Sequence, residues 1–187
     1  MGRVLQIPFN TDMVRAILDG RKTVTRRLIK LPDGMSGRPI GDCRDPDNPL
    51  GFMNPCGIKR PPYDVGDIMY VRETWCLRYD GEKYFYKADK NTPREEKRFI
   101  DYDHVSWKPS IHMPKEAARI WLKVKDVRVE RLQEITEEQA LAEGAIDNRA
   151  FVHSPDNEHS NIHSAKEHFA QIWNSAIKKS DLGRYGW

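Results

Sequence analysis

The stretch from 31 to 63 constrains the fold most, because it offers no pattern from which a helix or strand could be built. It holds seven of the twelve prolines and five of the twelve glycines of the 187-residue chain. Proline removes a backbone donor and glycine weakens regular structure, so the stretch predicts a long irregular surface insertion. The core must come from the flanking residues, and we expect a single domain over 1–187 with an insertion at about 31–63.

The flanking sequence carries both helical and strand patterns. A helix is expected from Asp12 to Asp19, capped by Thr11 and stopped by Gly20. Strands are expected in "DVGDIMYVRETW", "EKYFYKAD" and "RIWLKVKDVRVERL", the last with a phase slip that suggests a bulge near Lys125-Asp126. "TEEQALAEG" and "SAKEHFAQIWNSAIKK" each begin with a capping box and predict two further helices. We therefore expect an α+β fold, a small curved or barrel-like sheet with helices against it.

Cysteine and histidine spacing argues against a disulfide framework and against a metal site. Cys43, Cys56 and Cys76 are odd in number and lack CxxC spacing, which favours free thiols in a reducing cytosol. Only His159 and His163 stand at the i, i+4 spacing that places two ligands on one helix face, and their surroundings are polar. No apolar run approaches the roughly 18 residues that span a bilayer. We expect a cytoplasmic protein with no membrane contact, metal or cofactor.

The net charge is only +3, so the local clustering of cations says more about partners than the total does. The densest cluster is "GRKTVTRR", which starts at Gly20, directly after the first expected helix. One interpretation is purely structural: cations beyond a helix C-terminus complement its negative end and remain solvated. The other is chemical, because Thr-Val-Thr is a good start for a strand and would hold the cations in fixed geometry.

The chemical interpretation centres on Lys22 and Thr25. Like charges disfavour a protonated amine, so crowding by Arg21, Arg26 and Arg27 should lower the pKa of Lys22. A neutral lysine is a competent general base, and a threonine hydroxyl needs such a base before it can attack. The stretch therefore contains the components of a Thr/Lys nucleophile pair.

Further candidate residues lie outside this cluster. Glu143 sits at a helix C-terminus, where the helix dipole disfavours a carboxylate, so it is either an exposed glutamate or a functional one. Arg72 and Glu73 alternate within a strand, which indicates either a side chain facing a polar cavity or an ion pair. Trp107 lies in "WKPSIHMP", which could wall a pocket for a flat ring or could simply pack.

"DGRKTVTRR" resembles the G-x-K-x-x-[acid or Thr]-x-R signature of ASCH (activating signal cointegrator homology) domains, with Gly20, Lys22, Thr25 and Arg27 at the matching places. "DVGDIMYVRETW", "WKPSIHMPKEAARIWLKV" and "LQEITEEQALAEG" are similar to landmarks of the larger bacterial and prophage members. The resemblance covers most of the chain from Ile7 onward. It implies a PUA-like fold, a compact β-barrel with flanking helices, associated with RNA and modified nucleotides. Similar proteins usually continue into a final hydrophobic strand, which this sequence lacks after 187.

The same superfamily includes a small amidohydrolase that deacetylates N4-acetylcytidine, and the resemblance implies its Lys/Thr/Glu triad at Lys22, Thr25 and Glu143. The expected function is hydrolysis of an N-acylated cytosine nucleoside. Arg27 would stabilise the oxyanion or hold the base carbonyl. Substrate-binding candidates are Arg26, Arg27, Arg72, Glu73 and Trp107. Two alternatives stay open: an RNA or modified-base binding module whose basic residues contact phosphates, and a ribonuclease on the same cleft.

Overall fold

The computed structural model describes residues 2–28, 62–77, 81, 83–90, 106–128, 130–149 and 163–187. Within these residues the chain is α+β, as expected, and its strands form two small sheets. The strands of the described part do not close into a barrel. The expected insertion at 31–63 lies outside the described residues except for positions 62 and 63.

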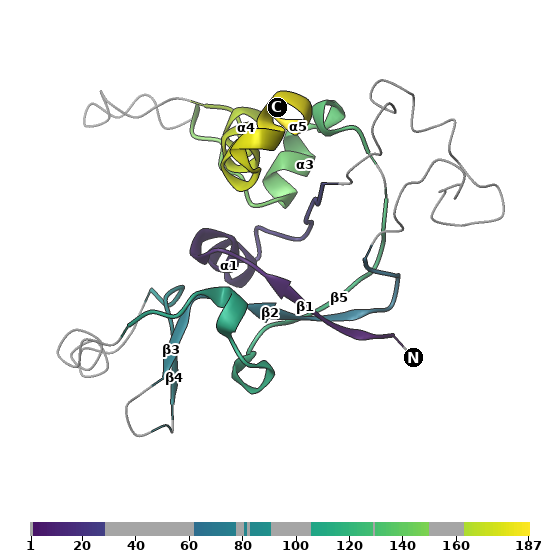
Figure 1. Cartoon of the computed structure of the whole chain (residues 1–187). Coiled ribbons are helices and arrows are strands. Elements are labelled where there is room, and N and C mark those ends of the chain that lie inside the picture. The colour runs from purple at the N-terminus through teal and green to yellow at the C-terminus, as the bar shows by residue number, and fades with distance from the viewer. Residues whose placement is uncertain are drawn as a thin grey trace.

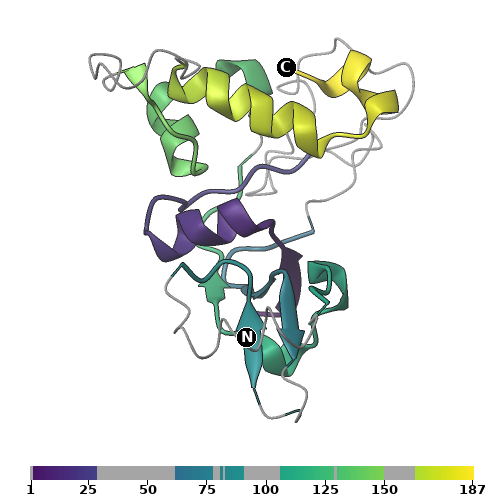
Figure 2. The same ribbon diagram turned by 90° about the vertical axis from the view of Figure 1, so that its left-hand side faces the viewer.

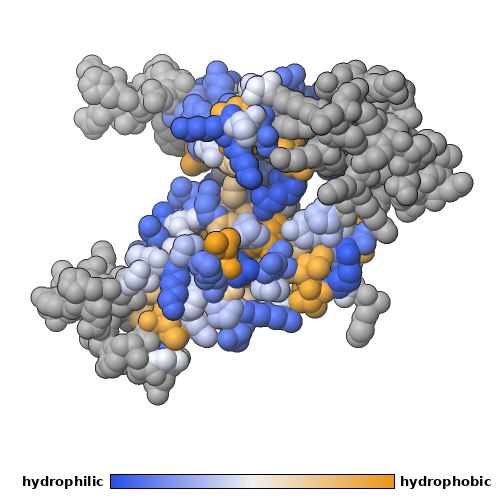
Figure 3. All heavy atoms as spheres, in the orientation of Figure 1, coloured by the Kyte–Doolittle hydropathy of each residue, from blue (hydrophilic) through white to orange (hydrophobic). Residues whose placement is uncertain are grey.

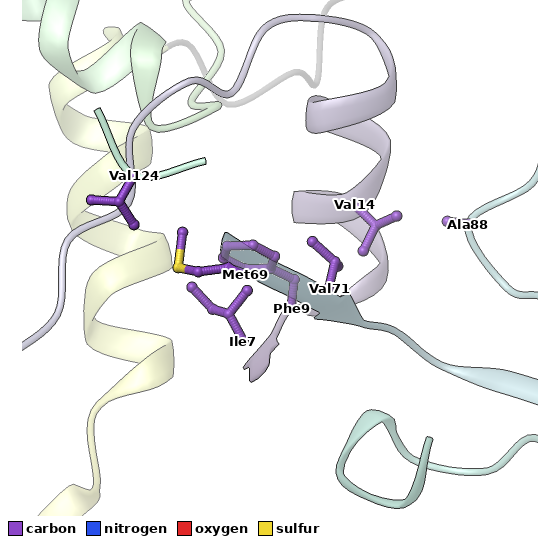
Figure 4. Close-up of a cluster of buried hydrophobic side chains, with 7 residues drawn as sticks. All are labelled: Ile7, Phe9, Val14, Met69, Val71, Ala88 and Val124. Carbon is purple, nitrogen blue, oxygen red and sulfur yellow. The ribbon is translucent and has the colours of Figure 1, made fainter. Parts of the chain in front are cut away.

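The larger sheet has the order β1-β2-β5 and is made of β1 (Val4–Pro8), β2 (Ile68–Arg72) and β5 (Trp121–Lys123). β1 runs parallel to β2, and β5 pairs antiparallel with β2 (Figure 1). Side chains alternate across a strand, so one face is apolar and buried. This face and α1 enclose the main core, shown in Figure 4: Ile7, Phe9, Val14, Met69, Val71, Ala88 and Val124.

Helix α1 spans Thr11–Leu18 and covers the inner face of this sheet. The prediction of a helix here is confirmed, but its cap is Asn10 rather than Thr11, because the Asn10 side chain accepts the Met13 N–H at 2.8 Å. Asparagine and threonine both cap helices well, so the sequence alone could not decide whether Asn10 or Thr11 would be the N-cap. Gly20 follows with φ of 73°, a left-handed conformation that ends the helix as expected.

A separate hairpin is formed by β3 (Trp75–Leu77) and β4 (Tyr84–Tyr86), which confirms the strand expected after the turn at Gly81. The strand expected in "RIWLKVKDVRVERL" is shorter than predicted: over the described residues it spans Trp121–Lys123, and backbone hydrogen bonds extend one residue further at each end, to Ile120 and Val124. Val124 and Val127 pack against the core without belonging to a strand, so the phase slip marks the strand's end and not a bulge. β1 was not predicted.

The C-terminal half of the described chain carries the helices α3 (Glu137–Ala142), α4 (Ala165–Ala176) and α5 (Leu182–Tyr185). Together they form a second part of the molecule beside the part built from α1 and the sheets. The two expected capping boxes are confirmed at the starts of α3 and α4. Their contact surface is a second apolar cluster: Ile135, Ala140, Ala145, Ala165 and Phe169. The buried side chains of α4 are Ala165, Phe169 and Ala170, whereas Ala176 is exposed.

The two parts lie one above the other, with α1 between the α3–α4 helices and the sheets (Figure 2). The surface is indented between them, and hydrophilic residues flank the indentation (Figure 3). No helix in the described ranges is both long and apolar enough to cross a membrane. The segment that follows α1 connects the sheets to the α3–α4 helices.

Candidate functional site

The segment 21–28 bridges the end of α1 and the end of α3. The N–H groups of Arg21 and Lys22 donate to the Ala16 carbonyl at 2.9 Å. The N–H groups of Thr23 and Val24 donate to the Ala142 carbonyl at 2.8 and 3.0 Å. The segment is irregular, so the expected strand in Thr-Val-Thr was wrong, because its donors go to a helix end and not to a strand.

Lys22 is buried, and its ammonium group points at the C-terminus of α3. Its Nζ donates to Glu143 Oε2 at 2.7 Å, to the Glu143 carbonyl at 2.8 Å and to the Val24 carbonyl at 2.8 Å. Three donors thus meet three acceptors, which is the full capacity of a protonated lysine. Only 2% of the Lys22 side chain and 7% of the Glu143 side chain are exposed, so the ion pair is almost fully desolvated.

The interpretation of Glu143 as an exposed glutamate was wrong, because Glu143 is buried. Glu143 is the C-cap of α3, and Gly144 follows with φ of 93°. A Cβ at Gly144 would lie 3.0 Å from the Ala16 Cβ and 3.3 Å from the Lys22 Cβ. Glycine therefore lets the end of α3 approach the end of α1 closely enough for the lysine to reach the carboxylate.

A second cation completes the environment of this carboxylate. Arg26 Nη1 donates to Glu143 Oε1 at 3.3 Å, and Arg26 Nη2 donates to Glu130 Oε2 at 2.6 Å. The two oxygens of Glu143 are therefore held by two different cations. This pairing offsets the unfavourable field at the helix C-terminus.

The pKa of Lys22 is lowered, as the sequence predicted, but the main cause is different. Burial is the largest cause, and Glu143 acts against it by favouring the charged form. Arg27 and Arg26 lower the pKa further by smaller amounts. Arg21 is directed elsewhere, since its guanidinium donates to the Gly144 carbonyl and to Asp19.

Phe9, a residue not predicted from the sequence, has two of these cations over its ring. Lys22 Nζ is 5.6 Å and the Arg27 guanidinium 5.5 Å from the centre of its buried ring. Arg27 also donates to the Pro8 carbonyl at 3.3 Å. The end of β1 thus fixes Arg27 beside Lys22 through cation–π contacts. Phe9 directly follows β1, a strand that was not predicted, and its contact with Lys22 and Arg27 was therefore not predicted either.

Thr25 is half-buried and follows the Val24 carbonyl that accepts from Lys22. Within the described residues its hydroxyl makes no hydrogen bond with Lys22, whose three donors are used elsewhere. A catalytic contact between them requires Lys22 to exchange one partner. Such contacts often form only in the complex with substrate.

Arg72 and Glu73 belong to different surroundings. Glu73 is buried and accepts both Arg119 Nε at 2.9 Å and Arg119 Nη2 at 3.0 Å, so the ion-pair alternative fits it. Arg72 donates to Gln6 Oε1 at 2.5 Å and to the Ile111 carbonyl. In the described part of the chain, no hydrogen bond or ion pair joins Arg72 or Glu73 to Lys22.

The remaining candidates are a tryptophan and the histidines. Trp107 is half-buried and precedes Lys108, whose backbone pairs with Trp75 of β3. His153 and His159 lie outside the described residues, while the rings of His163 and His168 stack with centres 4.8 Å apart. Over the described ranges, no cluster of three or more His, Cys, Asp or Glu side chains is arranged to hold a metal ion.

Comparisons with known proteins return no significant match. No protein-family model, no curated protein and no solved structure matches the chain.

Proposed function

We propose that this protein is an amidohydrolase that removes the acyl group from N4-acetylcytidine or a related N-acylated nucleoside. The observation that carries the proposal is the buried pair between Lys22 and Glu143, which lie 121 residues apart in sequence. Lys22 is a desolvated lysine with a lowered pKa, and its Nζ lies 2.7 Å from a Glu143 oxygen, so it is placed to pass a proton to that carboxylate. Paired acid and base groups of this kind are concentrated in active sites.

The proposed reaction begins with a proton shift from Lys22 to Glu143, across the 2.7 Å contact between Nζ and Oε2. Exclusion of water by a bound substrate favours this shift, because two desolvated charges become neutral. The neutral lysine then accepts the proton of the Thr25 hydroxyl, and the Thr25 oxygen attacks the acetyl carbonyl.

Collapse of the tetrahedral intermediate breaks the bond between the acetyl carbon and N4. The departing nitrogen takes a proton from Lys22, which leaves cytidine and an acetyl ester on Thr25. Water, deprotonated by Lys22, then attacks this ester; as the bond between the acetyl carbon and the Thr25 oxygen breaks, Lys22 returns the proton to that oxygen and acetic acid leaves, ionising to acetate. Each step uses Lys22 as the proton carrier, and Glu143 holds or returns the second proton.

The two arginines have separate parts in this scheme. Arg26 holds Glu143 Oε1 at 3.3 Å and fixes the direction in which the carboxylate faces Lys22. Arg27 is exposed, and among the described residues its guanidinium donates to the Pro8 carbonyl, which leaves further donors for the oxyanion or for the base carbonyl. Arg72, Glu73 and Trp107 remain proposed contacts for the nucleoside.

The test is incubation of the protein with N4-acetylcytidine in the presence of a chelator, with cytidine measured by chromatography. Wild type is expected to form cytidine, and Lys22→Met is expected to form none while it keeps the circular dichroism spectrum of the folded protein. Lys90→Met is the matched control, because Lys90 is an exposed lysine paired with Asp19 on the surface. Equal rates for wild type and Lys22→Met would contradict the proposal.

The family, fold type and setting belong to the same proposal. The motifs support membership of the ASCH family, and the α+β class is compatible with a PUA-like barrel. A cytoplasmic location fits the proposed nucleoside substrate. A folded protein that forms no cytidine would favour the alternatives, in which the same cleft binds or cleaves RNA.

A further inference from the structure

The sheet β1-β2-β5 has a second face, which points away from α1. Its side chains alternate with those of the core, and pairing places Tyr70 between Gln6 on β1 and Trp121 on β5. Trp121 is 47% exposed and Val4 is 49% exposed, so this face is open to solvent at β5 and at the start of β1. Trp121 stands on the edge strand β5, directly opposite Tyr70 of the central strand β2, so the two rings form an aromatic pair on this face.

Two lysines accompany the aromatic side chains. The rings of Tyr70 and Trp121 are 5.8 Å apart and tilted by 45°. Lys115 Nζ lies 5.9 Å from the centre of each ring. Lys123 is exposed and follows Trp121 by two residues, so it lies on the same face. We call Tyr70, Trp121, Lys115 and Lys123 the outward patch.

The charge of the outward patch is not neutralised. Within the described part of the chain, neither Lys115 nor Lys123 forms an ion pair with a carboxylate, in contrast to Lys22, Lys90 and Arg119. Arg72 follows Tyr70 by two residues on the same face and adds a third cation. With Glu116, which is exposed beside Lys115, these side chains sum to two positive charges. A ligand that suits this surface therefore has flat rings for the aromatic pair and negative charge for the lysines.

We infer that the outward patch binds single-stranded nucleic acid, with a base stacked on Trp121 and phosphates near Lys115 and Lys123. Base–aromatic stacking tolerates any sequence, and lysines near the strand contact its phosphates without base specificity. The patch lies on the opposite face of the sheet from α1, whereas Lys22 follows α1. The inference thus adds a binding surface separate from the Lys22–Glu143 pair, and it does not depend on the proposed hydrolysis.

The test uses a fluorescently labelled 12-nucleotide oligouridine and measures its anisotropy with wild type and variants in low salt. Trp121→Ala is expected to weaken binding by about tenfold or more, and Trp121→Phe by less because a ring remains. Lys115→Ala is expected to reduce the slope of log K against log salt by about 0.7, the value for one phosphate contact on a single strand.

Lys108→Ala is the matched control, because Lys108 also lies over a tryptophan, Trp75, at 5.0 Å but belongs to the β3–β4 sheet. It should leave oligouridine affinity unchanged. Lys22→Met should also bind normally, and Trp121→Ala should still deacetylate the free nucleoside, so failure of either proposal is distinguishable from failure of the other. Binding that is unaffected by Trp121→Ala would overturn the inference, as would wild-type self-association through the patch without oligonucleotide binding.

Discussion

The buried pair between Lys22 and Glu143 predicts a specific pattern of stability in single and double variants. At 2.7 Å, two unit charges attract each other by about 6 kcal/mol at an effective dielectric of about 20. Desolvation of both groups offsets most of this attraction. Loss of one partner leaves the other charge buried, which typically costs about 3–5 kcal/mol.

For Glu143→Gln we expect a loss of about 3 kcal/mol, at the lower end of that range for a broken buried pair. The reason is that Lys22 keeps two carbonyl acceptors, at Glu143 and at Val24, and the glutamine offers a neutral third. Lys22→Met should cost less, roughly 1–2 kcal/mol, because Arg26 still pairs with Glu143 and methionine fills the volume.

The double variant Lys22→Met/Glu143→Gln should be more stable than the sum of the two losses implies, by about 2 kcal/mol of coupling. Urea unfolding, followed by tryptophan fluorescence, measures all four proteins under one condition. Strictly additive losses, or a Glu143→Gln variant within about 0.5 kcal/mol of wild type, would refute the burial argument.

Three further predictions follow from the same region and from the N-terminal strand. Gly144→Ala should lower stability by about 1–3 kcal/mol, measured by thermal unfolding, because a Cβ would lie 3.0 Å from the Ala16 Cβ at a φ of 93°. Burial lowers the pKa of Lys22 from 10.5, so the folded protein binds fewer protons than the unfolded chain between the two values, and stability rises with pH over that window. Lys22→Met should lack this rise in urea titrations at increasing pH. Arg3 lowers the pKa of Asp67 below its usual 3.8, so Asp67→Asn should reduce the melting temperature above that pH, and the deficit should shrink as pH falls through the lowered value.

Local signals in the sequence predicted much of the framework of the site. The capping boxes and the glycines at the ends of α1 and α3 are short-range features, and they placed Lys22 just after one helix and Glu143 at the end of another. What brings the two residues together is the close approach at Gly144, which no local pattern encodes. Only the motif resemblance linked them beforehand.

Strand β1, the partner of Glu73 and the cause of the Lys22 pKa shift could not be predicted from local sequence patterns, because each depends on residues far apart in the chain. β1 has five residues, includes a proline and gains its stability from parallel pairing with β2, 64 residues later. Glu73 pairs with Arg119, 46 residues away, so its alternation with Arg72 could not show which partner it would find. The cause of the lowered pKa of Lys22 was misjudged because burial depends on packing, whereas neighbouring charges are visible in the sequence.

The most direct test of the proposed function compares two neighbouring threonines. Thr25→Val removes the proposed nucleophile, while Thr23→Val removes an exposed hydroxyl from the same segment. The measurement is kcat/KM for deacetylation of N4-acetylcytidine by wild type and both variants. The proposed mechanism predicts activity near wild type for Thr23→Val and no detectable turnover for folded Thr25→Val. Equal activity of the two variants would contradict it.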